Sequence, residues 1–308
     1  MAEFFRYGLA RTNSTDAHFR AWVTFIHESM VAGGWVNTSD TGQLDIPTAS
    51  KPVSSNEQVG YKIYRMSDAL QATKPIYVKF AFGSNSANIP AVWQTIGSGS
   101  NGSGSITGTI FSASQPGGRI GSGGGLDFGS SAVTRAFDSN TAEDTTSIAG
   151  VGSNYCGFSM LYTASGVGFT FAIERGRNED GSLDGDRIVF ISNAGFAPLQ
   201  RMTSGDHGTS SRNMTDNSQI PFTRMPYTQP AEDVKVGVGY IFPANYDREL
   251  QPPMRSFTVV PSASMANFGY LDVRWGDETI RYRHLGYVSL MGWWGSDSSN
   301  SRVLMRVS

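Results

Sequence analysis

The sequence predicts a mainly β protein, an antiparallel sandwich or jelly-roll-like fold with one N-terminal amphipathic helix. From residue 61 onward, short runs of alternating apolar and polar residues recur between clusters of Gly, Ser, Asn, Asp and Pro, as in strands joined by turns. A single segment near the N-terminus has helical periodicity instead. Because no helical pattern separates the later strands, parallel strand–helix–strand units are not expected.

The helix is predicted over residues 16–31. Its large apolar residues are spaced three or four positions apart, as one helical face requires: Phe19, Trp22, Ile26 and Met30. The Asn13-Ser14-Thr15 cluster supplies N-cap residues, and Gly33-Gly34 permits a left-handed turn at the end. We expect this helix to lie across a sheet.

The strands are predicted from period-two alternation. They cover residues 60–66, 76–82, 91–96, 106–113, 157–163, 168–174, 187–192, 234–242, 257–260, 270–275, 279–282, 286–291 and 302–307. Two links have the composition of tight hairpin turns: residues 178–186 and the dipeptide Gly276-Asp277.

Three polar segments interrupt the strand pattern. Residues 97–104 and 117–129 are rich in Gly and Ser, and residues 204–219 are polar without periodicity. If the first two segments were linkers, a boundary near residue 115 would separate 1–114 from 115–308. We favour loops in a single β-rich domain, 1–308, and we expect neighbouring subunits to order these loops.

Charge is scarce in this chain. Charged residues make up 16%, against about 25% in a typical soluble domain, and the net charge is −2. Without a run of Lys or Arg we expect no nucleic-acid partner. A weakly charged surface favours protein–protein contact, and arginine, which outnumbers lysine almost fourfold, suits interface hydrogen bonds.

Targeting signals are not expected. No stretch of 18 apolar residues occurs, and the first ten residues contain Glu3 and Arg6. The sequence therefore predicts neither a signal peptide nor insertion into a membrane.

Two short motifs resemble catalytic signatures and fail on context. Residues 97–102 satisfy GxGxxG, but a β-like segment follows, so no helix N-terminus would hold a pyrophosphate. His27-Glu28 begins like a zinc-protease helix, but Val31 stands where the second histidine ligand belongs. We interpret His18 and His27 as solvated or capping residues.

Asp180, Asp184 and Asp186 form the one candidate cation site. They place several oxygen ligands in one hairpin, as Ca²⁺ requires, but Asp and Gly also suit a tight turn, and the turn is the favoured interpretation. No cofactor and no catalytic residue is predicted. Glycosidase carboxylates need only be neighbours in space, so spacing in the sequence does not bear on them.

Trp293 and Trp294 are the candidate interface or receptor residues. Exposed, they could stack on a sugar ring, and buried, they would anchor a core or subunit interface. The structural interpretation is favoured, because burying large aromatics removes much apolar surface from water.

Five segments resemble a group of tailed-bacteriophage virion structural proteins. They read YKIYRMSDALQ at 61–71, PIYVKFAFGS at 75–84, PAVWQTIGSG at 90–99, NGSGSITG at 101–108 and FTFAIER at 169–175. The glycine–aspartate pairs Asp180-Gly181 and Gly185-Asp186 continue the last segment. The resemblance covers less than a third of the chain and brings no catalytic residues.

The resemblance implies a structural virion component, not an enzyme, made in the host cytoplasm and kept in the virion. We expect it in the tail, baseplate or neck, as a homo-oligomer packed against copies of itself and other virion proteins. Two alternatives stay open: a capsid decoration protein, and a receptor- or carbohydrate-binding module that touches the host surface through Trp293 and Trp294.

Overall fold

The computed structural model describes most of the predicted elements. The described residues are 2–8, 15–32, 34–84, 90–112, 125–127, 145–152, 155–162, 168–178, 180, 182–194, 200–204, 210–213, 222–227, 238–243, 255, 257–261, 269–275, 277–289 and 301–307.

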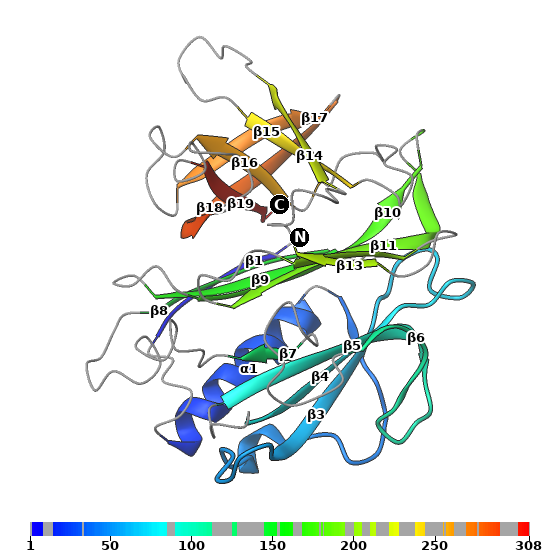
Figure 1. The fold of residues 1–308 in the computed structure, drawn as a ribbon, viewed down its shortest axis with the longest axis vertical. Helices are drawn as coiled ribbons and strands as arrows, with labels where there is room; N and C mark the ends of the chain where they lie inside the picture. The colour runs from blue at the N-terminus through cyan, green and yellow to red at the C-terminus, as the bar shows by residue number, and fades with distance from the viewer. Residues whose placement is uncertain are drawn as a thin grey trace.

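The described strands form three antiparallel sheets, of seven, six and six strands, which we name sheets A, C and B. Sheet A lies between sheet C on one side and sheet B with helix α1 on the other (Figure 1). A mainly β, antiparallel protein with one N-terminal helix is thus confirmed. The narrower prediction of a sandwich or jelly roll stays a prediction.

Helix α1 (Asp16–Ala32) begins at the predicted residue and ends one residue later than predicted. At its end the N–H of Gly34 donates to the Val31 carbonyl and that of Trp35 to the Met30 carbonyl, and Gly34 has φ of 78°. These two bonds are a Schellman motif, which needs a left-handed residue where Gly34 stands.

The side chains of the apolar face of α1 that the structure describes are buried, and that of Trp22 lies outside the described residues. Phe19, Ile26 and Met30 of the predicted face are buried, and Val23 and Phe25 join them. The helix contacts β8 (Thr145–Gly152) and β9 (Tyr155–Tyr162) of sheet A. It therefore lies across a sheet, as predicted, and fills the space between sheets A and B (Figure 1).

Sheet B is a meander in which consecutive strands are neighbours. Its strands are β2 (Val36–Asn37), β3 (Gln58–Arg65), β4 (Tyr77–Ser84), β5 (Pro90–Ser100), β6 (Ile106–Ser112) and β7 (Gly125–Asp127), which pairs with β5. A 3-10 turn, η1 (Ile46–Thr48), follows β2. Strand alternation gives the sheet two buried faces, one with Tyr64 and Phe80 and one with Ile63 and Trp93.

Sheet A joins the N-terminus to the middle of the chain. Its order is β1 (Ala2–Gly8), β8, β9, β10 (Gly168–Arg177), β11 (Leu183–Ala194), β12 (Gln200–Ser204) and β13 (Ser210–Asn213). Because β1 pairs with β8, helix α1 and sheet B are inserted in the sequence between two neighbouring strands of sheet A.

Sheet C contains the last six described strands. In spatial order they are β14 (Phe222–Tyr227), β15 (Val238–Pro243), β16 (Phe257–Pro261), β19 (Ser301–Arg306), β18 (Glu278–Ser289) and β17 (Tyr270–Trp275). Sheet C meets sheet A where β18 contacts β9 and β19 contacts β8.

Several details differ from the sequence predictions. Residues 97–100, predicted as loop, continue strand β5, because they pair with β6. The segments 279–282 and 286–291 were predicted as two strands, but 278–289 is one strand, β18. Residues 204–219 are not one long loop, since 210–213 pair with β12 as β13.

Both predicted hairpins form, although the first turn is shorter than predicted, because residues 183–186 belong to β11. Arg177 pairs with Leu183 across the first turn, and Trp275 pairs with Glu278 across Gly276-Asp277. The boundary near residue 115 stays a prediction, although β7 pairs with β5 and β8 with β1 across that position.

Candidate functional site

Two adjacent ionic residues, Glu174 and Arg175, occupy the centre of the three-layer structure. Both lie on β10, and both are buried. Because consecutive residues of a strand point to opposite faces, the carboxylate and the guanidinium leave sheet A in opposite directions. Arg175 reaches the connection between strands β3 and β4. We call sheet B, this connection and α1 the sheet B unit. Glu174 reaches the layer of sheet C.

Arg175 binds the sheet B unit. Its Nε donates to Asp68 Oδ2, and its Nη2 donates to Asp68 Oδ1 at 3.2 Å and to the Lys74 carbonyl at 2.9 Å. Asp68 Oδ1 also accepts the Leu70 N–H at 3.1 Å, which fixes the turn after β3. The side chains of Arg175 and Asp68 are 0% and 1% exposed, so this bidentate ion pair is dry.

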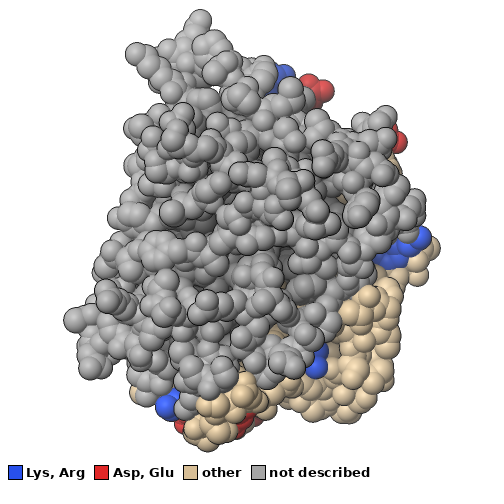
Figure 2. Space-filling model, viewed as in Figure 1, with Lys and Arg blue, Asp and Glu red and all other residues tan. Residues whose placement is uncertain are grey.

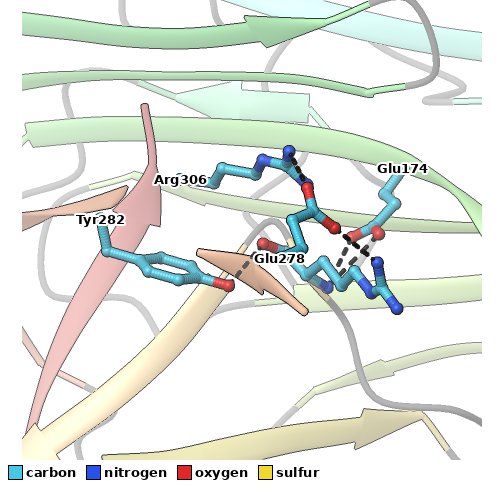
Figure 3. A network of polar contacts seen from close by, with 5 residues as sticks. Glu174, Glu278, Tyr282 and Arg306 are labelled. Atoms are coloured by element: carbon cyan, nitrogen blue, oxygen red, sulfur yellow. Dashed lines mark hydrogen bonds and ion pairs between the residues drawn. The ribbon is translucent and has the colours of Figure 1, made fainter. Parts of the chain in front are cut away.

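Glu174 begins a second network that reaches sheet C (Figure 3). Its two carboxylate oxygens each accept the Arg255 backbone N–H at 3.3 Å. Arg255 Nη1 donates to Glu278 Oε2 at 2.9 Å, and Arg306 Nη2 donates to Glu278 Oε1 at 3.0 Å. The Tyr282 hydroxyl donates to the Arg255 carbonyl at 2.8 Å.

The second network is wetter than the first. The Arg306 side chain, at 8%, is buried, but those of Arg255 and Glu278 are 27% and 44% exposed. Water therefore competes for their charges. Breaking one of these pairs should cost less folding free energy than breaking a buried bidentate pair. Chemically, both networks hold unlike charges together and join layers.

The tip of the β5–β6 hairpin is held by residues of the same chain. Asp40 accepts hydrogen bonds from the Ser100 hydroxyl and from the Gly104 N–H, the latter at 3.1 Å. Lys79 Nζ donates to the Gly104 carbonyl at 2.7 Å and lies 4.5 Å from the centroid of the Tyr61 ring. These contacts hold the tip within one chain, and the expectation that a neighbouring subunit orders residues 97–104 stays a prediction.

The charges at this hairpin tip are tuned by burial and hydrogen bonds. Burial alone would raise the pKa of the Asp40 carboxyl, but the hydrogen bonds from the Ser100 hydroxyl and the Gly104 N–H outweigh burial and lower the pKa. Burial lowers the pKa of the Lys79 ammonium, and the charge of Asp40 opposes that shift. The carboxylate thus stays ionised and keeps its donors at neutral pH.

His27 is a structural residue and not the solvated or capping one predicted. Its Nδ1 lies 2.9 Å from the hydroxyl of Tyr64, a fully buried residue of β3. Burial and the charge of Lys62 lower the pKa of the imidazole, while Glu28 acts in the opposite direction. The contact fastens α1 to sheet B.

The structure tests the predicted site residues only in part. Asp180 is exposed and accepts the Ser182 N–H at 2.9 Å, which is the turn role that the sequence favoured. Asp184 and Asp186 lie on β11 with side chains outside the described residues, so the cation site stays a prediction. Trp293 and Trp294 lie outside the described residues altogether.

The remaining sequence features concern the GxGxxG segment, metal ions, surface charge and membrane spans. The GxGxxG segment leads from β5 into β6 and not into a helix. Among the described residues, no three His, Cys, Asp or Glu side chains gather where they could hold a metal ion. On the face in Figure 2, the described Lys and Arg side chains lie apart from one another. No described helix has the length and apolar character that a membrane span needs.

The residues that join the layers were missed from sequence. Asp68 and Arg175 are 107 positions apart, and nothing in spacing connects them. A weak signal existed, since Glu174-Arg175 interrupts the apolar alternation of 169–173 with two charges in the middle of a strand.

Comparison with known proteins adds no relative. No protein-family model matches the chain, and no match to it was found among curated proteins.

Proposed function

We propose that this chain is a structural component of a tailed-phage virion, placed in the tail, baseplate or neck. It works by packing against other copies of itself and against other virion proteins, it is not an enzyme, and it is made in the host cytoplasm before assembly. The starting point is the resemblance of residues 61–108 and 169–175 to virion structural proteins.

The observation that carries the proposal is that two buried charged residues join the middle sheet to the layers on both sides. The segment 169–175 ends in Glu174-Arg175, and these two residues tie the middle sheet to both outer layers. Buried charges that are matched in this way stabilise one arrangement of the layers over others. Buried contacts of this kind between layers suit a protein that must keep its conformation under mechanical load from adjacent subunits.

The composition supports the same function. A chain with 16% charged residues loses little hydration when its surface is covered by another protein. Large antiparallel sheets also offer edges and flat faces for contact between subunits.

Fractionation of purified particles tests the proposal. Particles of the phage that encodes the chain are separated into heads and tails, and the chain is detected by mass spectrometry and placed by imaging of intact particles. We expect the chain in the tail fraction, in several copies around the particle axis. Recovery with heads would favour a decoration protein, and absence from the particle would overturn the virion role.

A single variant addresses the host-binding alternative. Particles carrying Trp294→Ala are compared with wild-type particles for assembly and for adsorption to host cells. We expect assembly to be affected at least as much as adsorption. Normal particles that no longer adsorb would instead assign Trp293 and Trp294 to a receptor-binding surface.

A further inference from the structure

Within the part of the chain that the structure describes, strand β17 is an edge strand of sheet C, and its residues form a self-complementary sequence. Among the strands that the structure describes, β17 pairs with β18 alone. Its solvent-facing residues are Tyr270, Asp272 and Arg274, and the Arg274 side chain, 74% exposed, lies 3.8 Å from the fully exposed carboxylate of Asp277. Asp272 and Arg274 stand symmetrically on either side of Val273.

The hairpin fixes which backbone groups of β17 point away from β18. In a hairpin with a two-residue connection, the pair that flanks the connection exchanges both backbone hydrogen bonds, and bonded pairs then alternate along the strands. Trp275 and Glu278 flank the connection here. The N–H and C=O groups of Tyr270, Asp272 and Arg274 therefore point outward.

A second β17 could pair with this edge in only a few antiparallel registers. One register places Asp272 opposite Asp272, and another places Arg274 opposite Arg274, so each opposes like charges. The register centred on Val273 places Asp272 opposite Arg274 twice, and these are the outward-pointing residues that hydrogen bonding needs. Charge and backbone geometry select the same register.

The neighbouring strand extends this pattern into a row of alternating charge. Within one chain, Arg281 of β18 lies opposite Asp272, with Nε–Oδ1 at 2.8 Å and Nη2–Oδ2 at 2.9 Å. In the centred register Arg274 of the second copy lies on the other side of Asp272. Each Asp272 would then stand between two guanidinium groups, and the row would occur twice by symmetry.

The same edge is stiffened before any partner arrives. Arg283 Nη1 donates to the Tyr270 hydroxyl at 2.9 Å, and the guanidinium of Arg283 lies 4.8 Å from the centroid of the Tyr270 ring. A strand already held in its extended shape loses less conformational entropy on pairing.

We infer that β17 pairs antiparallel with β17 of a second copy of this chain, about a twofold axis through Val273. The two C sheets merge into one sheet, with Leu271 at the register position opposite Trp275 of the second copy. This inference deepens the proposed assembly function by naming one contact surface, and it rests on that function only for its place in the particle. Charges on an edge strand also deter unrelated strands, which gives the contact its selectivity.

Cysteine cross-linking tests the register. In the centred register Val273 faces itself in a non-hydrogen-bonded pair, with Cα atoms about 4.5 Å apart, which a disulfide can bridge. Leu271 residues of the two copies would be four positions out of line, roughly 13 Å apart. After mild oxidation of the purified protein, we expect a covalent dimer from Val273→Cys and none from Leu271→Cys.

The wild-type protein is the control for cross-links through Cys156, the single native cysteine. Equal cross-linking of Val273→Cys and Leu271→Cys would overturn the register, because it would report random collision. A Val273→Cys protein that does not cross-link although it is dimeric would overturn it too.

A surface variant tests the same contact without touching the core. Arg274→Asp places like charges opposite each other at both symmetric positions and should raise the dimer dissociation constant on the order of tenfold or more. Arg274→Lys keeps the charge and should dimerise nearly as well as wild type. Sedimentation analysis measures both.

Failure of this inference and failure of the virion function are separable. A chain that is found in particles but stays monomeric in solution, or dimerises regardless of Arg274→Asp, overturns the β17 contact and leaves the virion role standing. A β17 dimer whose chain is absent from particles overturns the virion role alone.

Discussion

Sheet A holds its two neighbouring layers in different ways, although both contacts start from adjacent residues of one strand. Toward sheet B, Arg175 meets Asp68 in a dry bidentate ion pair with 0% and 1% exposed side chains. Toward sheet C, Glu174 meets a backbone N–H, and the charges beyond it, Arg255 and Glu278, are 27% and 44% exposed.

The difference teaches which layer is fixed and which is adjustable. A buried ion pair loses several kcal/mol when one partner is removed, because the remaining charge is stranded without water. A half-exposed pair can exchange its partner for water at little cost. We therefore expect α1, sheet B and sheet A to behave as one unit, and sheet C to separate from that unit first.

The largest effect is expected from breaking the dry ion pair. Arg175→Ala strands the Asp68 carboxylate in the interior and should lower the free energy of unfolding by about 3–5 kcal/mol. Urea unfolding followed by circular dichroism measures the change.

The double variant Asp68→Asn/Arg175→Met is the control for that loss. It removes both charges while keeping the volume, and it should regain most of the stability that Arg175→Ala loses. If Arg175→Ala cost no more than a surface substitution, the dry pair would not be what fixes sheet B to sheet A.

The next effect is expected at the hairpin tip of sheet B. Gly104 has φ of 93°, and a Cβ there would lie 2.5 Å from Tyr61 ring atoms. Gly104→Ala should cost about 2–3 kcal/mol, from left-handed strain plus the displaced ring. Gly102→Ala is the matched control, because Gly102 has φ of 80° with nothing within 4 Å, so strain alone of about 1 kcal/mol remains. Equal losses in thermal unfolding would contradict the close packing of this tip.

A smaller effect is expected in the network that reaches sheet C. Glu278→Gln keeps the side-chain size but removes the charge that Arg255 and Arg306 share, and it should cost about 1 kcal/mol. At about 1 M salt, where charges are screened within roughly 3 Å, this loss should shrink while that of Arg175→Ala persists. Asp277→Asn, at the exposed neighbouring position, should change nothing measurable. Equal salt responses of the two networks would remove the contrast between the layers.

The smallest effect is a pH dependence at the contact between α1 and sheet B. Burial and Lys62 lower the pKa of His27, so the folded protein binds fewer protons at this residue than the unfolded chain. Stability should fall as the pH drops below the ordinary histidine value of 6.5 toward 5. His27→Gln keeps a hydrogen-bonding group near Tyr64 and should flatten this slope in urea titrations. An unchanged slope would show that another group is responsible.

Local patterns in the sequence predict the helix and the strands that alternate clearly, but not β2, β7 or β12 to β14. Helix α1 was predictable from its face and from the Gly33-Gly34 end, and the meander of β3 to β5 from alternation and turns. Strands β1 and β8 were missed, since β1 has two adjacent aromatics, Phe4 and Phe5, and β8 has small residues, so neither alternates clearly.

The contacts between layers could not be predicted in the same way. They join Asp68 to Arg175 and Glu174 to Arg255, across 107 and 81 positions, and periodicity carries no information over such separations. The prediction of a loop over the Gly/Ser-rich residues 97–104 was wrong for a related reason. Its composition indicates a loop. However, Gly104 is held by Asp40 and Lys79, and these two partners lie 64 and 25 positions away in the sequence.

Native-state hydrogen exchange along a urea series, read by mass spectrometry, tests the contrast between the layers most directly. We expect amides of β18 in sheet C to open at a lower free energy than amides of β4 in sheet B, and 1 M salt to widen that gap. Exchange of β18 and β4 at the same free energy, with the same response to salt, would show that all three layers open together and would contradict the account.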